Sequence, residues 1–344
     1  MPPNYKPPKL ISSSPLIIDL MSATSLQAHN PEHSPARPLN ILRDLPQVAD
    51  LIEVCFSSTL DDESQSYLQN MRRASRDDNF LRWAGNVIDS ASLPMTGYVW
   101  EENGRIIGNA SLMYNHYKGK KLALIANVAT HPNYRRRGIG RILTERALNH
   151  ARQKNVSTIW LQVREDNPTA IKIYSDLGFV ERARRTTYTV KLGTPLAGPE
   201  NGLPISKVNP RDWPLQQKWL EHSYPEELGW YKHFEWNLFT PGLWNWLYRF
   251  FVELDMRQWA AYKNGELLAT LGWISSWNLP DTLYAAAKPD GDAAALRSAL
   301  EAARRNLGAQ RKLSVDYPAG EMSEAFQSAG FSVYRTLLWM SATS

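Results

Sequence analysis

The clearest pattern of apolar and polar positions along the chain is a pair of short β runs on either side of an Asn-Gly dipeptide. It occurs once in each half: residues 98–100 and 105–108 flank Asn103-Gly104, and residues 259–262 and 266–269 flank Asn264-Gly265. Asn-Gly is a strong hairpin signal, because both residues tolerate the positive φ of a tight turn. The sequence therefore predicts one β-hairpin in each half.

The remaining predicted elements follow in the same order in the two halves. Each half has a helix opened by Asp and Pro (Asp44, Pro46; Asp212, Pro214), a strand that ends at Pro (124–132; 283–289), a longer helix (to about Lys154; to about Arg305), a last strand (158–163; 312–316) and a short helix closed by Gly-Phe (Gly178-Phe179; Gly330-Phe331). Asp is expected as the helix N-cap, and Gly suits the left-handed position after a helix end. The matching order predicts an internal duplication, and the mixture of elements predicts an α/β fold with a mixed sheet in two tandem lobes.

A stretch rich in Pro and Gly near the middle of the chain, residues 193–204, is typical of a linker. We expect one domain over residues 38–192 and a second over residues 205–344. Residues 1–37 are rich in Pro, Ser and Asn, and we expect them to be a disordered lead-in.

Composition narrows the class of protein. The 344 residues are 43% hydrophobic with a formal net charge of +5, and no long run of Lys and Arg occurs, so the sequence does not favour a nucleic-acid binder. No run of about 18 apolar residues is present, which argues against a membrane span. Cys55 is the single cysteine, so no internal disulfide forms. These features predict a soluble cytoplasmic protein.

The region with the most evident chemistry is the basic loop before the longer helix of the first half. Ile139, Ile142 and Leu143 recur at helical spacing, so a helix is expected to begin near Gly138. Its first N–H groups lack intrahelical acceptors and, with the helix dipole, form an anion site. The glycines allow close approach of a phosphate, and four arginines add positive charge: Arg135, Arg136, Arg137 and Arg141. The loop predicts a diphosphate cradle; the alternative is a basic loop before an ordinary helix.

Two blocks of the first half resemble the GNAT superfamily of N-acetyltransferases. They are Asn127-Val128-Ala129-Thr130-His131-Pro132-Asn133-Tyr134-Arg135-Arg136-Arg137-Gly138-Ile139-Gly140 and residues 161–179, which run from Leu161-Gln162-Val163 to Leu177-Gly178-Phe179. The resemblance spans about residues 38–190. It implies an acyl-CoA N-acyltransferase fold with acetyl-CoA as co-substrate, and we expect no metal.

The resemblance also implies roles for individual residues. Backbone groups of a splayed strand, at Val128, Ala129 and Thr130, would pair with the pantetheine arm. Asn167 would contact the cofactor beyond the next strand, and Tyr174 would lie near the thioester sulfur. The amides of the loop and helix start would hold the pyrophosphate: Arg135, Arg136, Arg137, Gly138, Ile139, Gly140 and Arg141.

The local sequence supports Tyr174 as a general acid. Asn167-Pro168 is a good helix start, and Ala170, Tyr174 and Leu177 then share one helix face. A phenol with a pKa near 10 is protonated at neutral pH and can give its proton to a thiolate leaving group. The alternative is a core tyrosine on an apolar stripe.

The general base has no clear candidate. Family members with a strand carboxylate carry it where this chain has Leu124, and residues 121–134 contain no acid. His116 and Tyr114 are close in sequence only, and the sequence does not assign the role to either. Water chains, the neutral fraction of the amine or a distant acid remain open.

The second half lacks the corresponding chemical groups. In the register of the two Gly-Phe closures, Tyr174 corresponds to Phe326 and Asn167 to Ala319. The segment after Pro289 carries Asp290 and Asp292 in place of the arginines, and two acids repel a diphosphate. We therefore expect a degenerate second lobe.

The first hypothesis is thus an enzyme that acetylates a primary amine, either on a small molecule or on a peptide. A catalytically weak acyl-CoA-binding pseudoenzyme, sensor or partner module is the second, and an ATP-binding module, which lacks G-x-x-x-x-G-K-[ST], is the third. The acceptor, the acyl chain length and the oligomeric state stay open. Nine tryptophans between residues 213 and 277 are expected to fill the core, with a substrate pocket as the alternative.

Overall fold

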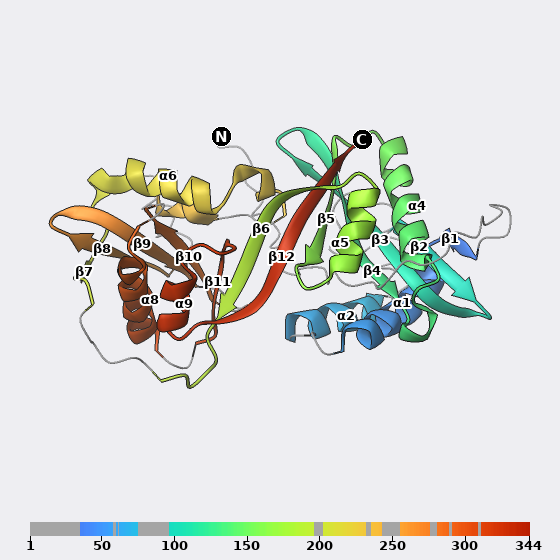
Figure 1. Ribbon diagram of the computed structural model, residues 1–344, viewed down its shortest axis with the longest axis horizontal. Coiled ribbons are helices and arrows are strands. Elements are labelled where there is room, and N and C mark those ends of the chain that lie inside the picture. Colours follow the sequence, from blue (N-terminus) through green and yellow to red (C-terminus); the bar gives the residue numbers. More distant parts are fainter. Residues whose placement is uncertain are drawn as a thin grey trace, which may run out of the picture. The chain divides into compact units, whose positions relative to one another are not determined.

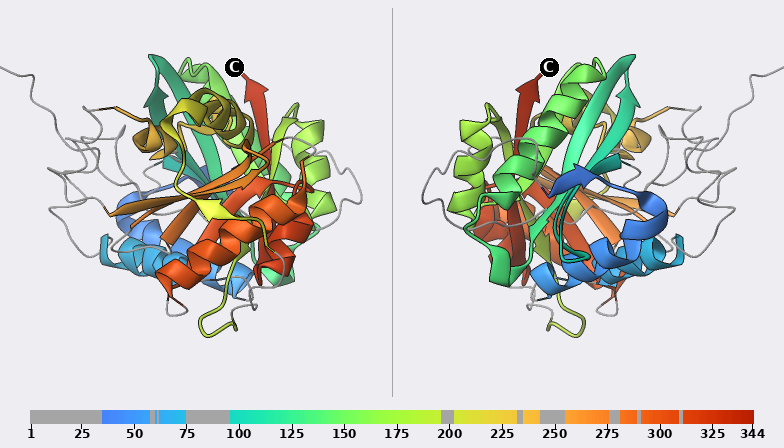
Figure 2. Two further views of the ribbon diagram at one scale, coloured as in Figure 1. Left: turned by 90° about the vertical axis from the view of Figure 1, so that its left-hand side faces the viewer. Right: turned by 90° about the vertical axis from the view of Figure 1, so that its right-hand side faces the viewer.

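The computed structural model (Figures 1 and 2) describes residues 35–57, 60, 62–74, 96–195, 202–231, 235–242, 255–275, 281–288, 291–308 and 311–344. Two compact units divide the chain. Unit 1 contains Met1–Arg182 together with Leu338–Ser344, and unit 2 contains Ala183–Leu337.

Unit 1 is a sheet with helices on both faces. Its elements are β1 (Ala36–Pro38), α1 (Ile41–Phe56), α2 (Asp62–Ala74), β2 (Thr96–Glu102), β3 (Arg105–Tyr117), β4 (Lys120–Thr130), the 3₁₀ turn η2 (Pro132–Tyr134), α4 (Ile139–Gln153), β5 (Thr158–Arg164), α5 (Pro168–Asp176) and the start of β6 (Val180–Thr189). The strand order is β1-β2-β3-β4-β5-β12, in which β12 is the C-terminal strand Ser332–Thr343. Strands β1 to β4 are antiparallel, and β4 pairs with β5 in parallel.

The two faces of this sheet have separate cores. Ile107 and Ala123 pack with Ile139 and Leu143 of α4. The neighbouring Ile106 packs instead with α1 and α2. Since successive strand residues point to opposite faces, α4 and the pair α1/α2 cover opposite faces of the sheet.

Several local predictions are confirmed. Asn103-Gly104 and Asn264-Gly265 form the turns of two hairpins, with φ of 52° and 73° in the first and 53° and 81° in the second. Gly178 and Gly330 follow the short helices with φ of 90° and 82°. Helix α4 begins directly after Gly138, as its apolar spacing predicts.

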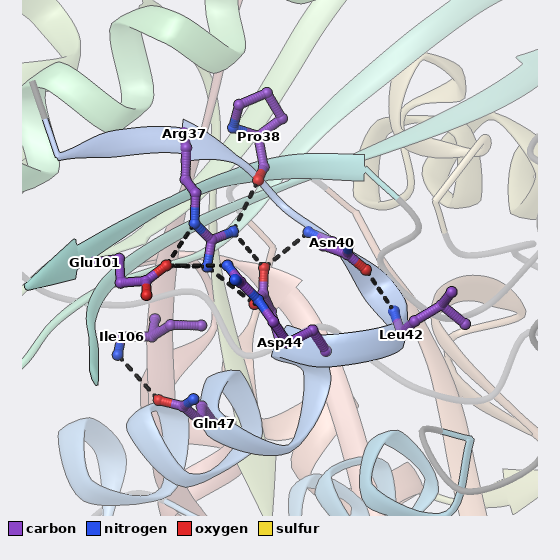
Figure 3. Close-up of polar contacts among 9 residues, drawn as sticks. Arg37, Pro38, Asn40, Leu42, Asp44, Gln47, Glu101 and Ile106 are labelled. Carbon is purple, nitrogen blue, oxygen red and sulfur yellow. Dashed lines mark hydrogen bonds and ion pairs between the residues drawn. The ribbon is translucent and has the colours of Figure 1, made fainter. Parts of the chain in front are cut away.

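The predicted role of Asp44 as an N-cap is wrong. Helix α1 begins at Ile41, and Asn40 is the cap, accepting a hydrogen bond from Leu42 N at 3.1 Å. Asp44 lies inside the helix and is buried, with Arg37 Nη1 donating to its carboxylate at 2.6 Å (Figure 3). Burial opposes ionisation of this carboxyl. Hydrogen bonds from Arg37, the Asn40 amide and Arg43 outweigh it and lower its pKa.

The strands of unit 2 also pair in both parallel and antiparallel orientation. Its elements are β7 (Ile205–Ser206), η3 (Pro210–Asp212), α6 (Trp213–Ser223), η4 (Glu226–Leu228), η5 (Glu235–Phe239), β8 (Met256–Lys263), β9 (Glu266–Ile274), β10 (Asp281–Ala287), α8 (Ala293–Leu307), β11 (Leu313–Pro318), α9 (Ser323–Ser328) and the start of β12 (Ser332–Thr343). Its strands follow the order β6-β11-β10-β9-β8-β7, with β10 parallel to β11.

Two expectations for unit 2 meet different outcomes. Asp212 occupies the predicted N-cap position of α6, with Pro214 just inside the helix, but its side chain makes no capping hydrogen bond. The side chain of Asn209 caps the preceding 3₁₀ turn. The tryptophans do fill the core where they are described. Four of them are buried: Trp219, Trp230, Trp259 and Trp273. Trp244, Trp246 and Trp277 lie outside the described residues.

The compact units differ from the domain limits expected from the sequence. The C-terminal residues 338–344 belong to unit 1, where Leu338, Met340 and Ala342 join its core. Ala36 and Arg37, expected in the lead-in, lie in β1. Residues 1–34 of that lead-in and residues 196–201 of the expected linker lie outside the described residues. Among the described helices, none is long and apolar enough to cross a membrane.

Candidate active site

The central feature of unit 1 is the separation of two parallel strands. β4 pairs with β5 from Leu122 to Ile125, opposite residues 158–161, and the pairing then stops. Within this fully described stretch, residues 126–130 of β4 have no register partner on β5. Val128, Ala129 and Thr130 lie in this segment, so their backbone groups are not paired with β5.

A β-bulge shapes the same segment of β4. On the β3 side, Ser111 pairs with Ala126 and Asn109 with Ala129, so Asn127 and Val128 lie opposite one residue. Asn127 has a φ of +52°, which an L-residue adopts at a cost. The bulge thus bends the strand where its pairing with β5 has ended.

The start of α4 follows the end of β4 along the chain. Gly138 has a left-handed conformation with φ of 75° and provides no side-chain cap. The first helical amide with a backbone acceptor is that of Ile142, which donates to Gly138 O at 3.1 Å. A Cβ placed on Gly138 would meet no atom within 4 Å, so the loop is open there. Uncapped amides at a helix start favour an anion.

The loop arginines differ in their contacts. Arg137 pairs with Glu102 at 3.1 Å, and its guanidinium lies 5.4 Å from the centre of the Tyr134 ring. Arg135 Nε donates to Thr130 O at 3.4 Å. Arg141 Nη1 lies 3.4 Å from Asp176, and hydrogen bonds from Lys172, then Arg141, help lower the pKa of that carboxyl. These exposed pairs contribute little to stability, so the arginines can turn toward an anionic ligand.

Asn167 combines a helix cap with an unused donor. Its Oδ1 accepts from Ala170 N at 3.2 Å, which confirms the predicted cap. Its Nδ2 is buried and has no hydrogen-bond partner among the described residues. A buried donor without an acceptor is costly, so this atom fits a ligand that brings a carbonyl or hydroxyl oxygen.

Tyr174 is 3% exposed and lies in the core cluster that contains Val128, Ile139 and Val163. Its ring meets the edge of Phe179 at 6.2 Å between centroids. Tyr174 therefore packs in the same core as the splayed strand and the start of α4. It is at once a core residue and a neighbour of the predicted cofactor elements.

The position expected for a carboxylate base is apolar. Leu124 is buried and lies opposite Trp160 of β5. His116 is exposed at the far end of β3, and Tyr114 carries Lys121 over its ring at 4.9 Å. Within the described part of the chain, no three His, Cys, Asp or Glu side chains gather to hold a metal ion.

A buried polar cluster beside the bulge was not predicted from the sequence. Its members are Tyr67, Asn109, Ser111 and Asn127, and all are buried. Asn is unfavourable within strands, so two asparagines inside apolar strand patterns were the available signal. Their contacts depend on the fold and could not be read from the sequence.

The first half of the chain is similar to a known protein family. Residues 46–179 match the Acetyltransferase (GNAT) family. This half therefore contains a GNAT-family domain.

Among curated proteins, the chain is 41% identical over 66 residues to the [ribosomal protein bS18]-alanine N-acetyltransferase of Escherichia coli K12, covering 19% of this chain and 45% of the relative. It is 36% identical over 81 residues to the Haemophilus influenzae protein of the same name, covering 24% and 53%. The chain thus spans about half the length of the curated relatives it matches.

A solved structure extends the likeness to both units. The GCN5-related N-acetyltransferase from Sphaerobacter thermophilus is 14% identical, with a TM-score of 0.51, and the match covers 90% of this chain and 96% of that one. At this identity the likeness concerns the fold. The fold of the chain is thus similar to that of this solved structure across both units.

Proposed function

We propose that this chain is an acetyl-CoA-dependent N-acetyltransferase whose single active site lies in unit 1. The observation that carries the proposal is the open edge of β4 at residues 126–130, followed by the uncapped start of α4 at Gly138. An extended arm would lie along Val128, Ala129 and Thr130. Its diphosphate would then meet the amides from Arg136 to Arg141.

The unused donor on Asn167 supports the same ligand. Its buried Nδ2 would donate to an oxygen of the pantetheine arm. Arg136 is exposed and next to the helix start, so it can add charge to the phosphate site. Asn167→Asp tests this role of the Nδ2 donor, because it keeps the helix cap and removes the donor.

The proposed reaction is direct transfer. The nitrogen of a neutral primary amine attacks the thioester carbonyl carbon, and the carbon–sulfur bond breaks. Tyr174 gives its phenolic proton to the departing thiolate, and the amine nitrogen loses a proton to solvent or to a base. Position 124 holds a leucine and no carboxylate. We therefore propose that water accepts the proton of the amine, or that the amine reacts from its neutral fraction and needs no base before attack.

The acceptor class is proposed as a primary amine. The matched relatives are named for acetylation of an alanine of a ribosomal protein, so peptides with N-terminal alanine belong in the first panel. Polyamines, amino acids and amine antibiotics complete it. Release of free CoA from acetyl-CoA with each amine is the direct measurement.

A binding protein without turnover is the competing function, favoured by the apolar residue at Leu124. Calorimetric titration with CoA separates the outcomes. Binding of about one CoA per chain, with amine-dependent release of CoA, supports the enzyme. Binding without transfer to any amine supports the pseudoenzyme, and no binding at all contradicts both.

A further inference from the structure

The buried polar cluster beside the β4 bulge links three elements of unit 1. Asn109 Nδ2, on β3, donates to Asn127 O at 2.7 Å and to Ser111 Oγ at 3.0 Å. Asn127 Nδ2, on β4, donates to Tyr67 Oη at 2.9 Å, and Tyr67 belongs to α2. Asn109 and Asn127 are 0% exposed and Tyr67 is 2% exposed, so water does not compete for these bonds.

Each contact acts on the conformation of the bulge. Asn127 has positive φ, a conformation that asparagine tolerates better than most residues with a Cβ. The side chain of Asn109 bonds to the backbone carbonyl of Asn127, and Tyr67 accepts a bond from the Asn127 side chain. Both the backbone and the side chain of Asn127 are therefore fixed. The bulge is thus held by specific hydrogen bonds as well as by packing.

The cluster carries a cost that packing alone does not explain. Asn109 Oδ1 and Asn127 Oδ1 are buried and have no hydrogen-bond partner among the described residues. Apolar residues would fill this part of the core without that cost. Strained conformations and unsatisfied polar groups persist mainly where a function needs them.

We propose that Asn127, Asn109 and Tyr67 are positioning residues that fix the β4 segment on which acetyl-CoA lies. The inference rests on the proposed function, because it concerns the same open edge at residues 126–130. In this proposal the side chains of the three residues bond to one another or to the bulge and do not touch the ligand. Asn127 acts through the backbone of Val128, its neighbour in the bulge, and Tyr67 makes α2 part of that support.

Tyr67→Phe is the cleanest test, since it removes one hydroxyl and keeps the ring. We expect the affinity for acetyl-CoA to fall about tenfold, the usual effect of losing one buried hydrogen bond on a positioned group. KM for the amine should change little. The matched control is Tyr98→Phe, which removes a hydroxyl bonded to His150 Nδ1 at 3.1 Å in the same unit and leaves the hydrogen bonds of Asn127 in place.

Asn127 variants separate the backbone requirement from the side-chain bond. Asn127→Gly keeps access to positive φ and should match Tyr67→Phe, whereas Asn127→Ala should bind acetyl-CoA more weakly still. In the double variant Asn127→Gly/Tyr67→Phe, we expect no further loss, because both changes remove the same hydrogen bond.

A merely structural cluster would give a different result. The urea midpoint would fall while the affinity of the folded protein for acetyl-CoA stayed at the wild-type value, and this outcome overturns the proposal. Additive losses in the double variant overturn it as well. Wild-type protein that binds acetyl-CoA but acetylates no amine contradicts the proposed activity alone, since the titrations still measure the cluster.

Discussion

The two units contain the same pair of parallel strands and use the space beyond them differently. In unit 1, β4 and β5 part after Ile125; in unit 2, β10 and β11 part after Leu283. In unit 2, the amide of Ala285, just beyond the last pair, donates to Tyr224 Oη at 2.9 Å. Aligned on the prolines that close the two strands, Ala285 corresponds to Val128. In unit 2, the phenol of Tyr224 thus bonds to the backbone amide at the position that corresponds to Val128 of unit 1.

Other residues of unit 2 complete this filling. Tyr317 of β11 is 1% exposed and lies beside the Ala287 backbone and Ser223, and burial raises the pKa of its phenol. Burial likewise raises the pKa of Tyr224 well above its usual value. Both phenols therefore remain neutral at any ordinary pH.

The strand itself and the following helix also differ. β10 pairs with β9 without interruption from Thr282 to Ala287, whereas β4 carries the bulge at Asn127. The N-cap of helix α8 is Asp292, whose carboxylate accepts from Ala294 N at 2.8 Å, whereas the N-cap of α4 is Gly138, which has no side chain to accept a bond. Asp290 lies outside the described residues. A lobe can therefore keep its sheet while its own side chains occupy the positions that a ligand would need.

The largest expected effect concerns the proposed proton donor, which is Tyr174 in unit 1 and has Phe326 as its counterpart in unit 2. Tyr174→Phe gives unit 1 the phenyl ring that unit 2 already has at Phe326, which is 0% exposed and stacked on Tyr188. We expect kcat to fall by about 10- to 10⁴-fold, because the thiolate loses its proton donor. Steady-state kinetics measures kcat, and titration with CoA is the control, expected to stay near the wild-type value. A nearly unchanged kcat would mean that water protonates the thiolate.

The next effect concerns the phosphate site. Gly138→Val places a β-branched residue at φ of 75° and a side chain over the helix start, so CoA affinity should fall by about tenfold or more. Gly104→Val is the matched control, with φ of 73° and equally open space in the β2–β3 turn. It should retain CoA binding. Equal losses in the two variants, or wild-type affinity in folded Gly138→Val, would remove the phosphate site from this loop.

The helix caps and turns that distinguish the two units could be predicted from the sequence, because they depend on residues that are close together along the chain. Asn167 as a cap, Gly138 before α4 and the two Asn-Gly turns all follow from backbone preferences of single residues. Asp44 was misassigned because Asn40, four residues earlier, is an equally good cap, and the sequence alone does not rank them.

Contacts between distant residues were beyond the sequence. The bond from Asn127 to Tyr67 spans 60 positions and that from Ala285 to Tyr224 spans 61. The membership of residues 338–344 in unit 1 depends on which strand the C-terminal segment joins. Local propensity does not determine such pairings, because the same alternating pattern fits either unit.

A smaller effect tests the filled position in unit 2. Tyr224→Phe leaves the buried amide of Ala285 without an acceptor, which should lower the free energy of unfolding by about 1–3 kcal/mol. Urea denaturation measures it. Tyr98→Phe, whose hydroxyl meets a half-buried imidazole, should cost less. The stoichiometry should remain about one CoA per chain, since Asp292 still caps α8. A Tyr224→Phe protein as stable as wild type would mean that the Ala285 bond contributes nothing.

The smallest expected effect is a difference between helices α4 and α8 in how stability depends on pH. His150 of α4 bonds to Tyr98 Oη, and burial, with a contribution from Lys154, lowers its pKa below the usual 6.5. The folded state therefore binds this proton less readily than the unfolded state. Stability from neutral His150 is fully present above pH 6.5 and is lost as the pH falls through the lower folded pKa.

Helix α8 should show no such dependence, because its sequence contains no histidine. Burial lowers the pKa of Arg304 there, but a guanidinium donating to Ala329 O at 2.6 Å stays charged throughout this range. We expect the urea midpoint of the wild type to decrease between pH 7.5 and pH 5.5 by slightly more than that of His150→Gln. Identical pH profiles for the two proteins would show that His150 titrates alike in the folded and unfolded states, and the difference between the helices would then rest on their N-termini alone.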